Sequence, residues 1–413
     1  MRTQFHSIRS DSLGRYYTDV LVSQALVAEL PANSPSTVLD LGCGTGSLSF
    51  AASRRWAKTN IVTVDLDRTI AHVLPEKLRE SGFTGIHHHL MFDALSPELA
   101  TSLGREKTQP DVAVCNPPFL VPKWKKDYSA ILEDVGLSSC LPAIATTDAA
   151  LVFLAQNLRL LRRGGVLGII VPDSIVSADK YRNFRTELLK RYQIRSATRL
   201  SRGSFGGTDA LAHILVIENS TPTSAPIALS LLDKAGARTS DLLVEHSQAA
   251  HRLDYQFHFA KSAVSQLGVR LGDIATDLRR GSLNSAEAKK ASNFVLHTTD
   301  LHQGNRGQWL DFSRRRFKFP EAKSGLVTRA EAGDIVVARV GRTAHEKVIG
   351  IGAGSVVLTD CLYRLRVAPT LQDAVLQALS SPEGRAWLEL HAYGVAARQL
   401  TKTDLLNLPI SIL

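Results

Sequence analysis

Close cysteine pairs and long apolar runs are both missing from this sequence. Its four cysteines, Cys43, Cys115, Cys140 and Cys361, are scattered along 413 residues, which excludes a zinc box or a disulfide framework and favours a reducing compartment. No segment approaches the roughly 18 consecutive apolar residues of a membrane span, and the first residues, MRTQFHSIRSDS, lack the apolar core of a signal peptide. We therefore expect a cytoplasmic protein with no metal site and no membrane contact.

The composition is that of a folded, basic protein. It is 44% hydrophobic and 21% charged, with a formal net charge of +10, and both halves are basic. An excess of positive charge favours a polyanionic partner, although a modest excess also serves solubility. At 413 residues the chain is too long for one ordinary domain.

A glycine-rich turn follows the first predicted strand, in the sequence LDLGCGTG at 39–46. Glycines here let a strand turn tightly into a helix and bring backbone close to a ligand. The spacing is not the GxGxxG of dinucleotide enzymes and lacks the Lys-Ser/Thr of a P-loop. An adenosine-type ligand without a pyrophosphate fits it better.

Two further predicted strands end in Asp65 and Asp93. Asp65 can accept hydrogen bonds from both hydroxyls of a ribose, and Asp93 can accept one from an adenine amino group. The alternative for Asp65 is a helix cap for the segment that begins at Thr69. Strands that alternate with helices and end in polar side chains predict a doubly wound α/β sheet, with a ligand crevice at the C-terminal ends of the strands.

The fourth predicted strand leads into Asn116-Pro117-Pro118-Phe119, the sequence NPPF. Neither proline donates a backbone N–H and both restrict φ, so the turn is rigid and rich in acceptors. Such a turn suits a flat ring that bears an exocyclic amino group. Proline pairs at strand ends are also ordinary loop residues.

In this order, the motifs resemble those of S-adenosylmethionine-dependent N6-adenine DNA methyltransferases of the gamma class. The segment GRYYTD at Gly14–Asp19 resembles the family's leading motif, with Asp19 where a proline is usual. The resemblance implies a Rossmann-like class I methyltransferase domain over 1–220. It implies that S-adenosyl-L-methionine is bound by the following residues: Tyr17, Thr18, Asp40, Gly42, Gly44, Asp65, Asp93 and Asn116.

By the same resemblance, Asn116, Pro117, Pro118 and Phe119 are catalytic. The Asn116 side-chain oxygen and the Pro117 carbonyl would accept the two hydrogens of the target amine, and Phe119 would stack on a flipped adenine. Phe205, in a glycine-rich loop at 201–213, would stack on its other face, the alternative being a plug over the core. A mechanism with a Cys115 nucleophile is disfavoured because no Pro-Cys is present.

The second half of the chain follows a run rich in Ser, Thr and Pro, at 219–226. We expect a linker and connecting segment over 221–266 and an α+β domain over 267–413. From Val269 the chain resembles one target-recognition half of a type I restriction-modification specificity subunit. Arg314, Arg316 and Lys318 would lie on one face of an extended segment and bind DNA; a solvated strand face is the alternative.

These features predict a site-specific DNA-methyltransferase that acts on adenine N6 of double-stranded DNA, in restriction-modification or phage defence. One alternative is an RNA or protein-glutamine methyltransferase with an NPP motif. Another is the methylase or DNA-binding subunit of a larger restriction complex, so partner subunits belong to the prediction.

Overall fold

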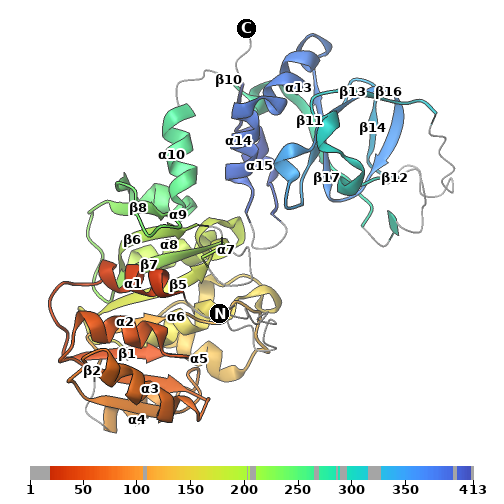
Figure 1. Cartoon of the computed structure of the whole chain (residues 1–413). Coiled ribbons are helices and arrows are strands. Elements are labelled where there is room, and N and C mark those ends of the chain that lie inside the picture. The colour runs from red at the N-terminus through yellow and green to blue at the C-terminus, as the bar shows by residue number, and fades with distance from the viewer. Residues whose placement is uncertain are drawn as a thin grey trace, which may run out of the picture. The chain divides into compact units, whose positions relative to one another are not determined.

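The computed structural model divides the chain into two compact units, Met1–His258 and Phe259–Leu413 (Figure 1). It describes residues 19–105, 109–201, 203–204, 211–264, 269–284, 287–288, 295–314, 327–393 and 398–410. Helix α10, Tyr255–Val264, runs across the division.

A nine-stranded sheet forms the centre of the first unit, in the order β3-β2-β1-β4-β5-β7-β6-β8-β9. Its strands are β1 (Thr37–Leu41), β2 (Asn60–Asp65), β3 (His87–Met91), β4 (Val112–Cys115), β5 (Val166–Pro172), β6 (Gln193–Leu200), β7 (Ala212–Glu218), β8 (Ile227–Leu232) and β9 (Leu242–Val244). Strands β1 to β5 are mutually parallel, and β7 is antiparallel to both β5 and β6. The order reverses between β1 and β4, which is the switch point of a doubly wound sheet.

Helices cover both faces of this sheet. They are α1 (Val20–Glu29), α2 (Ser47–Arg55), α3 (Ile70–Glu80), α4 (Leu99–Arg105), α5 (Lys126–Asp134), α6 (Ala149–Leu160), α7 (Asp173–Ser177), α8 (Arg182–Arg191), α9 (His246–His251) and α10. The apolar residues of α1, α2 and α3 join one core cluster with those of β1, β2, β4 and β5. All seven residues of β5 are buried, as expected for a strand covered on both faces. The predicted doubly wound α/β sheet is confirmed.

The segment 221–266, predicted as a linker with connecting elements, is largely part of the first unit. Strand β8 pairs in parallel with β6, and β9 pairs with β8. Ile227 and Leu229 have no exposed surface. Apolar alternation in β8 gives it a core face, so the Ser, Thr and Pro run precedes a paired strand and marks no domain boundary.

The second unit contains a seven-stranded mixed sheet and a separate strand pair. The sheet contains β11 (Ala275–Arg280), β12 (Val295–Leu296), β13 (Trp309–Phe312), β14 (Arg329–Glu331), β15 (Ile335–Ala338), β16 (Val348–Leu358) and β17 (Leu362–Val367). The pair joins β10 (Val269–Arg270) to β18 (Pro409–Ile410). The helices are α11 (Leu271–Ile274), α13 (Gln372–Ser380), α14 (Pro382–His391) and α15 (Lys402–Leu406).

Two cores lie on the two faces of this second sheet. Along β15, Ile335 and Val337 join the cluster that α13, α14 and α15 cover, whereas Val336 and Ala338 join the other. This alternation is the period of two of a strand buried on both faces. The predicted α+β architecture of this part is confirmed. None of the helices in the described ranges is both long and apolar enough to cross a bilayer.

Candidate active site

Four polar or glycine-rich segments lie at one edge of the first sheet, beyond the C-terminal ends of four parallel strands. They are the turn Gly42–Gly46 after β1, Asp65 at the end of β2, Asp93 after β3, and Asn116–Phe119 after β4. The glycine turn and the NPPF segment flank the β1–β4 switch point, where ligands bind in sheets of this topology.

Hydrogen bonds join these segments along the edge. The backbone N–H of Gly42 donates to the Val64 carbonyl at 2.8 Å, and that of Gly44 donates to Asp65 Oδ2, also at 2.8 Å. The N–H of Phe92 donates to the Asp65 carbonyl at 3.2 Å. The ends of β1, β2 and β3 are therefore held in one fixed arrangement.

The three glycines of the turn have different surroundings. All have positive φ: +74° at Gly42, +50° at Gly44 and +77° at Gly46. A Cβ on Gly46 would lie 2.3 Å from Leu74 Cδ1 of α3, whereas one on Gly44 would meet nothing within 4 Å. A side chain at position 46 would therefore displace Leu74, whereas Gly44 presents backbone to open space, where a ligand can approach it.

Asp65 has a structural role besides any ligand contact. Its Oδ2 accepts from Gly44 and its Oδ1 accepts from the Asp67 N–H at 3.0 Å. A carboxylate has about four lone-pair positions, so acceptor capacity is left for ribose hydroxyls. Helix α3 has Thr69 as its N-cap and no side-chain cap hydrogen bond, and neither donor to Asp65 belongs to this helix. Asp65 therefore does not have the capping role considered for it from the sequence.

Asp40 lies beneath the turn and is only 1% exposed. Its Oδ2 accepts from the Ser49 hydroxyl at 2.6 Å and from the Ser49 N–H at 3.1 Å. Its Oδ1 has no hydrogen-bond partner among the described residues, and burial raises the pKa of this carboxyl to about 7. Asp40 therefore acts on the first turns of α2 through Ser49, a residue that was not predicted to matter.

The NPPF segment begins where β4 is fully buried. The Cys115 thiol donates to the Leu41 carbonyl of β1 at 3.1 Å, and burial raises its pKa well above the ordinary value. Since a thiolate is the reactive form, Cys115 is a structural residue. Pro117 is buried, Asn116 is partly buried, and Phe119 is partly buried against the core of the unit.

Asp93 contacts a residue from the loop after NPPF. Lys125 Nζ donates to Asp93 Oδ2 at 3.3 Å, which raises the pKa of the lysine. Asp93 Oδ1 accepts from the Leu95 N–H at 2.9 Å. This contact was not predicted; three lysines around Trp124 directly after NPPF were the available signal.

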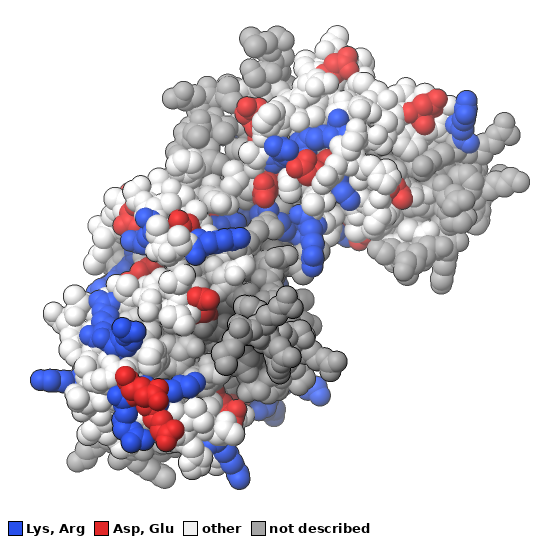
Figure 2. All heavy atoms as spheres, in the orientation of Figure 1, with Lys and Arg blue, Asp and Glu red and all other residues white. Residues whose placement is uncertain are grey.

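Several predicted residues lie outside the described part of the chain: Tyr17, Thr18, Phe205, Arg316 and Lys318. Arg314 is described and exposed, two residues beyond the end of β13. On the face of the protein in Figure 2, acidic and basic side chains are interspersed. Among the described residues, no group of three His, Cys, Asp or Glu side chains is placed to hold a metal ion.

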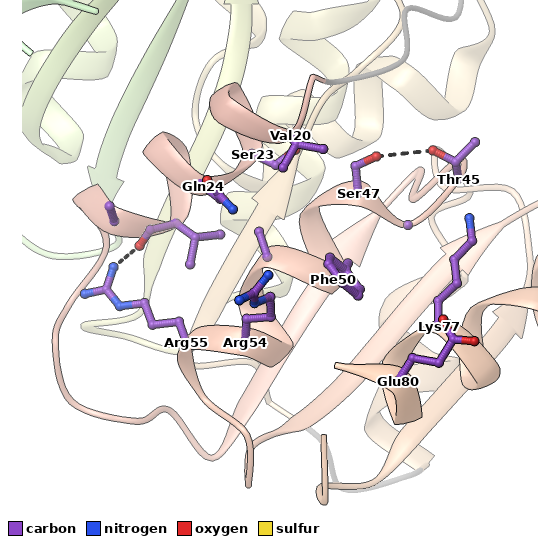
Figure 3. Close-up of a pocket in the computed structure, with 14 residues that line it drawn as sticks. Val20, Ser23, Gln24, Thr45, Ser47, Phe50, Arg54, Arg55, Lys77 and Glu80 are labelled. Atoms are coloured by element: carbon purple, nitrogen blue, oxygen red, sulfur yellow. Dashed lines mark hydrogen bonds between the residues drawn. The ribbon is translucent and has the colours of Figure 1, made fainter. Parts of the chain in front are cut away.

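A cavity of about 720 Å³ lies between α1, α2 and α3, beside the glycine turn. Figure 3 shows Ser23 and Gln24 of α1 opposite Phe50 of α2, with Lys77 and Glu80 of α3 along one side. Its lining includes Thr45, Gly46 and Ser47 but not Asp65, Asp93 or Asn116. The cavity therefore lies on the face covered by α1, α2 and α3, and it adjoins the C-terminal edge of β1–β4 only at the glycine turn.

The residues at the strand-tip edge fit a nucleoside cofactor. Such a cofactor needs open space beside the backbone and carboxylates that can accept hydrogen bonds. Gly44 faces open space, Asp65 has spare acceptor capacity, and the Asp93 side chain is 42% exposed. Nothing in this set of described residues resembles a pyrophosphate or metal site.

Two curated proteins are similar in sequence to part of this chain. The type II methyltransferase M.BsuBI of Bacillus subtilis is 27% identical over 199 residues, covering 44% of this chain and 38% of that protein. A tRNA1(Val) (adenine(37)-N6)-methyltransferase of Flavobacterium psychrophilum is 25% identical over 150 residues, covering 36% of this chain and 58% of that protein. The chain thus matches less than two thirds of the length of either relative.

A solved structure and a family model match larger parts of the chain. The type IIG restriction endonuclease BpuSI matches with a TM-score of 0.53 at 13% identity, over 97% of this chain and 59% of that chain, which shows a shared fold. The model of the N-6 DNA Methylase family matches residues 3–254. Because that match spans more than half of the 413 residues, the chain belongs to the N-6 DNA Methylase family.

Proposed function

We propose that this protein is a site-specific, S-adenosylmethionine-dependent DNA methyltransferase that modifies adenine N6. One observation carries the proposal: the glycine turn, Asp65, Asp93 and NPPF lie together at the C-terminal edge of β1–β4. Membership of the N-6 DNA Methylase family and the 27% identity to M.BsuBI support it.

The cofactor would lie along the ends of β1, β2 and β3. S-adenosylmethionine, when bound, supplies a methyl group on a positively charged sulfur. Gly42 and Gly44 would allow close backbone approach, Asp65 would accept from the ribose hydroxyls, and Asp93 would accept from the adenine amine. Tyr17, Thr18 and Asn116 would complete the site by resemblance, and Asp40 would position the turn through Ser49.

Asn116 and Pro117 would prepare the target amine. The lone pair of the adenine exocyclic nitrogen is delocalised into the ring, so the nitrogen is a poor nucleophile. Acceptance of its two hydrogens by the Asn116 side-chain oxygen and the Pro117 carbonyl favours a tetrahedral nitrogen with an available lone pair. Catalysis would rest on positioning and electrostatics, without a covalent enzyme intermediate.

An adenine in a duplex must leave the stack to reach this turn. Phe119 would stack on one face of the extruded base and Phe205 on the other, each contact worth roughly 1–3 kcal/mol. The packing of Phe119 against the core supports a fixed ring orientation. Pro118 would keep the turn rigid between Pro117 and Phe119.

The remainder of the chain would read the target. We propose target recognition for 267–413, with DNA contacts from Arg314, Arg316 and Lys318, and a methyltransferase domain that extends from 1–220 into β8 and β9. A restriction-modification or phage-defence system, with or without partner subunits, is the proposed setting.

RNA is the second candidate substrate, because the tRNA methyltransferase of Flavobacterium psychrophilum is 25% identical over 150 residues. A protein glutamine would be a third methyl acceptor for an NPP turn, and a role as one subunit of a larger restriction complex is compatible with DNA as the substrate. The presence of a second folded unit after the first favours a substrate that needs sequence reading.

The test is transfer of a labelled methyl group to purified macromolecules. We expect label in double-stranded DNA, recovered as N6-methyladenine after digestion to nucleosides. Label found only in RNA or in protein would contradict the proposal. Single-molecule sequencing of DNA from cells with and without the protein would then give the recognition site.

A further inference from the structure

The segment Val121–Lys126, which we call the lysine loop, directly follows the NPPF turn. Its side chains alternate in burial: Val121, Lys123 and Lys125 are exposed, whereas Pro122 and Trp124 are partly buried. This is the pattern of an extended segment with one face on the protein. The exposed face carries two cations and an apolar side chain, Val121, which is 53% exposed.

Contacts of Trp124 and Lys125 hold the lysine loop in place. Trp124 Nε1 donates to the Ser129 hydroxyl of α5 at 3.3 Å, and its ring packs edge-on to Tyr128 with centroids 5.6 Å apart. Lys125 pairs with Asp93 at 3.3 Å. Strands β1 and β2 lie between β4 and β3 in the sheet. The Lys125–Asp93 pair therefore joins the loop after β4 to the loop after β3, on the far side of the ends of β1 and β2.

Lys123 and Lys126 are exposed, and neither makes an ion pair with any described residue. Helix stability does not explain the cations at this point. Lys125 is the N-cap of α5 and Lys126 its first residue, with no side-chain cap, where Ser, Thr, Asp or Asn are preferred and positive charge is unfavourable.

We propose that the lysine loop binds the sugar-phosphate backbone of the target strand next to the extruded base, through Lys123 and Lys126. This inference rests on the proposed function, because it takes the NPPF turn as the place where the base is held. Lys123 is four residues beyond Phe119, so their Cα atoms are at most about 14 Å apart. A base held by Phe119 brings its own flanking phosphates to that neighbourhood.

Each lysine that neutralises a phosphate steepens the salt dependence of binding. The slope of log K against log salt changes by about 0.9 per phosphate contact on duplex DNA. Lys125 is assigned a different role from Lys123 and Lys126. It pairs with Asp93 and thereby positions the loop.

The test compares two double variants of the full chain. Lys123→Gln with Lys126→Gln removes the proposed contacts. Lys58→Gln with Arg163→Gln is the matched control, because both side chains are exposed and both precede strands, β2 and β5, at the opposite edge of the sheet. Binding of a fluorescent random-sequence DNA duplex, and of a random-sequence RNA, is measured by anisotropy over a salt series.

We expect the lysine-loop variant to flatten the duplex-DNA slope by about 2, while the control keeps the wild-type slope. An unchanged slope in the lysine-loop variant, or an equal loss in the control, would overturn the proposal. A loss on RNA alone would overturn DNA as the partner. Transfer of a labelled methyl group by the wild type at low salt is a separate measurement. Its failure would contradict the proposed function, whereas the salt slopes would still test whether the lysine loop binds DNA.

Discussion

In the first unit, polar groups gather beyond the ends of four parallel strands, whereas in the second unit charged side chains pair with one another across and beside antiparallel strands. Arg364 of β17 pairs with Asp277 of β11, and Arg366 pairs with Asp334 at 2.7 Å. Arg280 pairs with Asp360 at 2.6 Å.

The difference follows from strand direction. Parallel strands all end at the same edge, so each loop after a strand adds its side chains to one place. Antiparallel neighbours end at opposite edges, and side chains directly or diagonally across from one another interact instead. Arg364, for example, is opposite Arg279 in the register and pairs with the diagonal neighbour Asp277. Changes at the first edge should therefore affect function more than folding, and changes to the pairs of the second unit should affect folding.

The largest expected effect is on activity, from Asn116→Ala. Loss of the proposed acceptor should lower the rate of methyl transfer by roughly 10²- to 10³-fold, the cost typical of one preorganised polar contact to a reacting group. Cofactor affinity should fall far less than the rate, because the glycine turn, Asp65 and Asp93 are unchanged, and the thermal midpoint should stay close to wild type. Single-turnover transfer and calorimetric titration with the cofactor measure the two quantities.

Asn60→Ala, at the N-terminal end of β2, is the matched control for Asn116→Ala and should keep full activity. Retained transfer in Asn116→Ala would remove the proposed acceptor, and with it the functional role assigned to this edge of the first sheet.

Asp40→Asn should change the pH dependence of stability. Burial raises the pKa of Asp40 to about 7, against about 3.9 in an unfolded chain. The folded state therefore binds this proton more tightly, and the free energy of unfolding falls as pH rises from about 4 to about 7. The variant should lose less stability over that range, by on the order of 2–4 kcal/mol.

Denaturant unfolding of the wild type and Asp40→Asn at several pH values makes the measurement. Glu133→Gln, at an exposed position of α5, should follow the wild-type profile. Parallel profiles for all three proteins would show that Asp40 titrates alike in the folded and unfolded states.

Asp277→Ala should destabilise the second unit by about 2 kcal/mol. It leaves the Arg364 guanidinium, whose side chain is only 7% exposed, with the Arg329 carbonyl as a partner and without its counter-charge. Arg364→Met should cost less, because Asp277, at 29% exposed, regains contact with water. Methyl transfer at saturating DNA should be unchanged; a smaller cost for Asp277→Ala than for Arg364→Met would contradict this account.

Gly44→Ala and Gly46→Ala should separate ligand approach from packing within one turn. Both lose roughly 1–2 kcal/mol to positive φ, but only a Cβ at position 46 meets Leu74. We expect Gly46→Ala to be the less stable of the two variants. Gly44→Ala should lose less stability but more of its affinity for the cofactor. Thermal unfolding with and without cofactor tests the order, and equal effects on both quantities would remove the distinction.

Local pattern was enough to predict most elements of the first unit. Glycines, prolines and acidic residues at the ends of apolar runs mark where strands stop, and the apolar periods mark strands and helices. Asp19, an N-cap residue type, stands directly before α1, and its Oδ1 accepts from the Leu21 N–H at 2.8 Å. Strand β8 was assigned to a connecting segment because the Ser, Thr and Pro run before it looks like a linker.

The NPPF motif and the order of the polar segments before it could be predicted from the sequence, because each depends on a few adjacent residues. Which of these segments contact one another could not be predicted. The Lys125–Asp93 contact joins residues 32 positions apart, and it exists only because the sheet places β3 and β4 in one parallel array. The burial of Asp40 likewise depends on α2 packing over β1, which puts Ser49 against it.

By itself, the sequence determined the doubly wound fold, the strand tips and their chemistry, since these arise from backbone restriction and short-range apolar periodicity. The tertiary structure decided which polar groups face a ligand and which hold the framework: Gly44 faces open space, Gly46 faces Leu74, Asp40 is buried and Lys125 spans the edge. The physical reason is that burial and long-range contact are set by packing between segments that are distant in the chain.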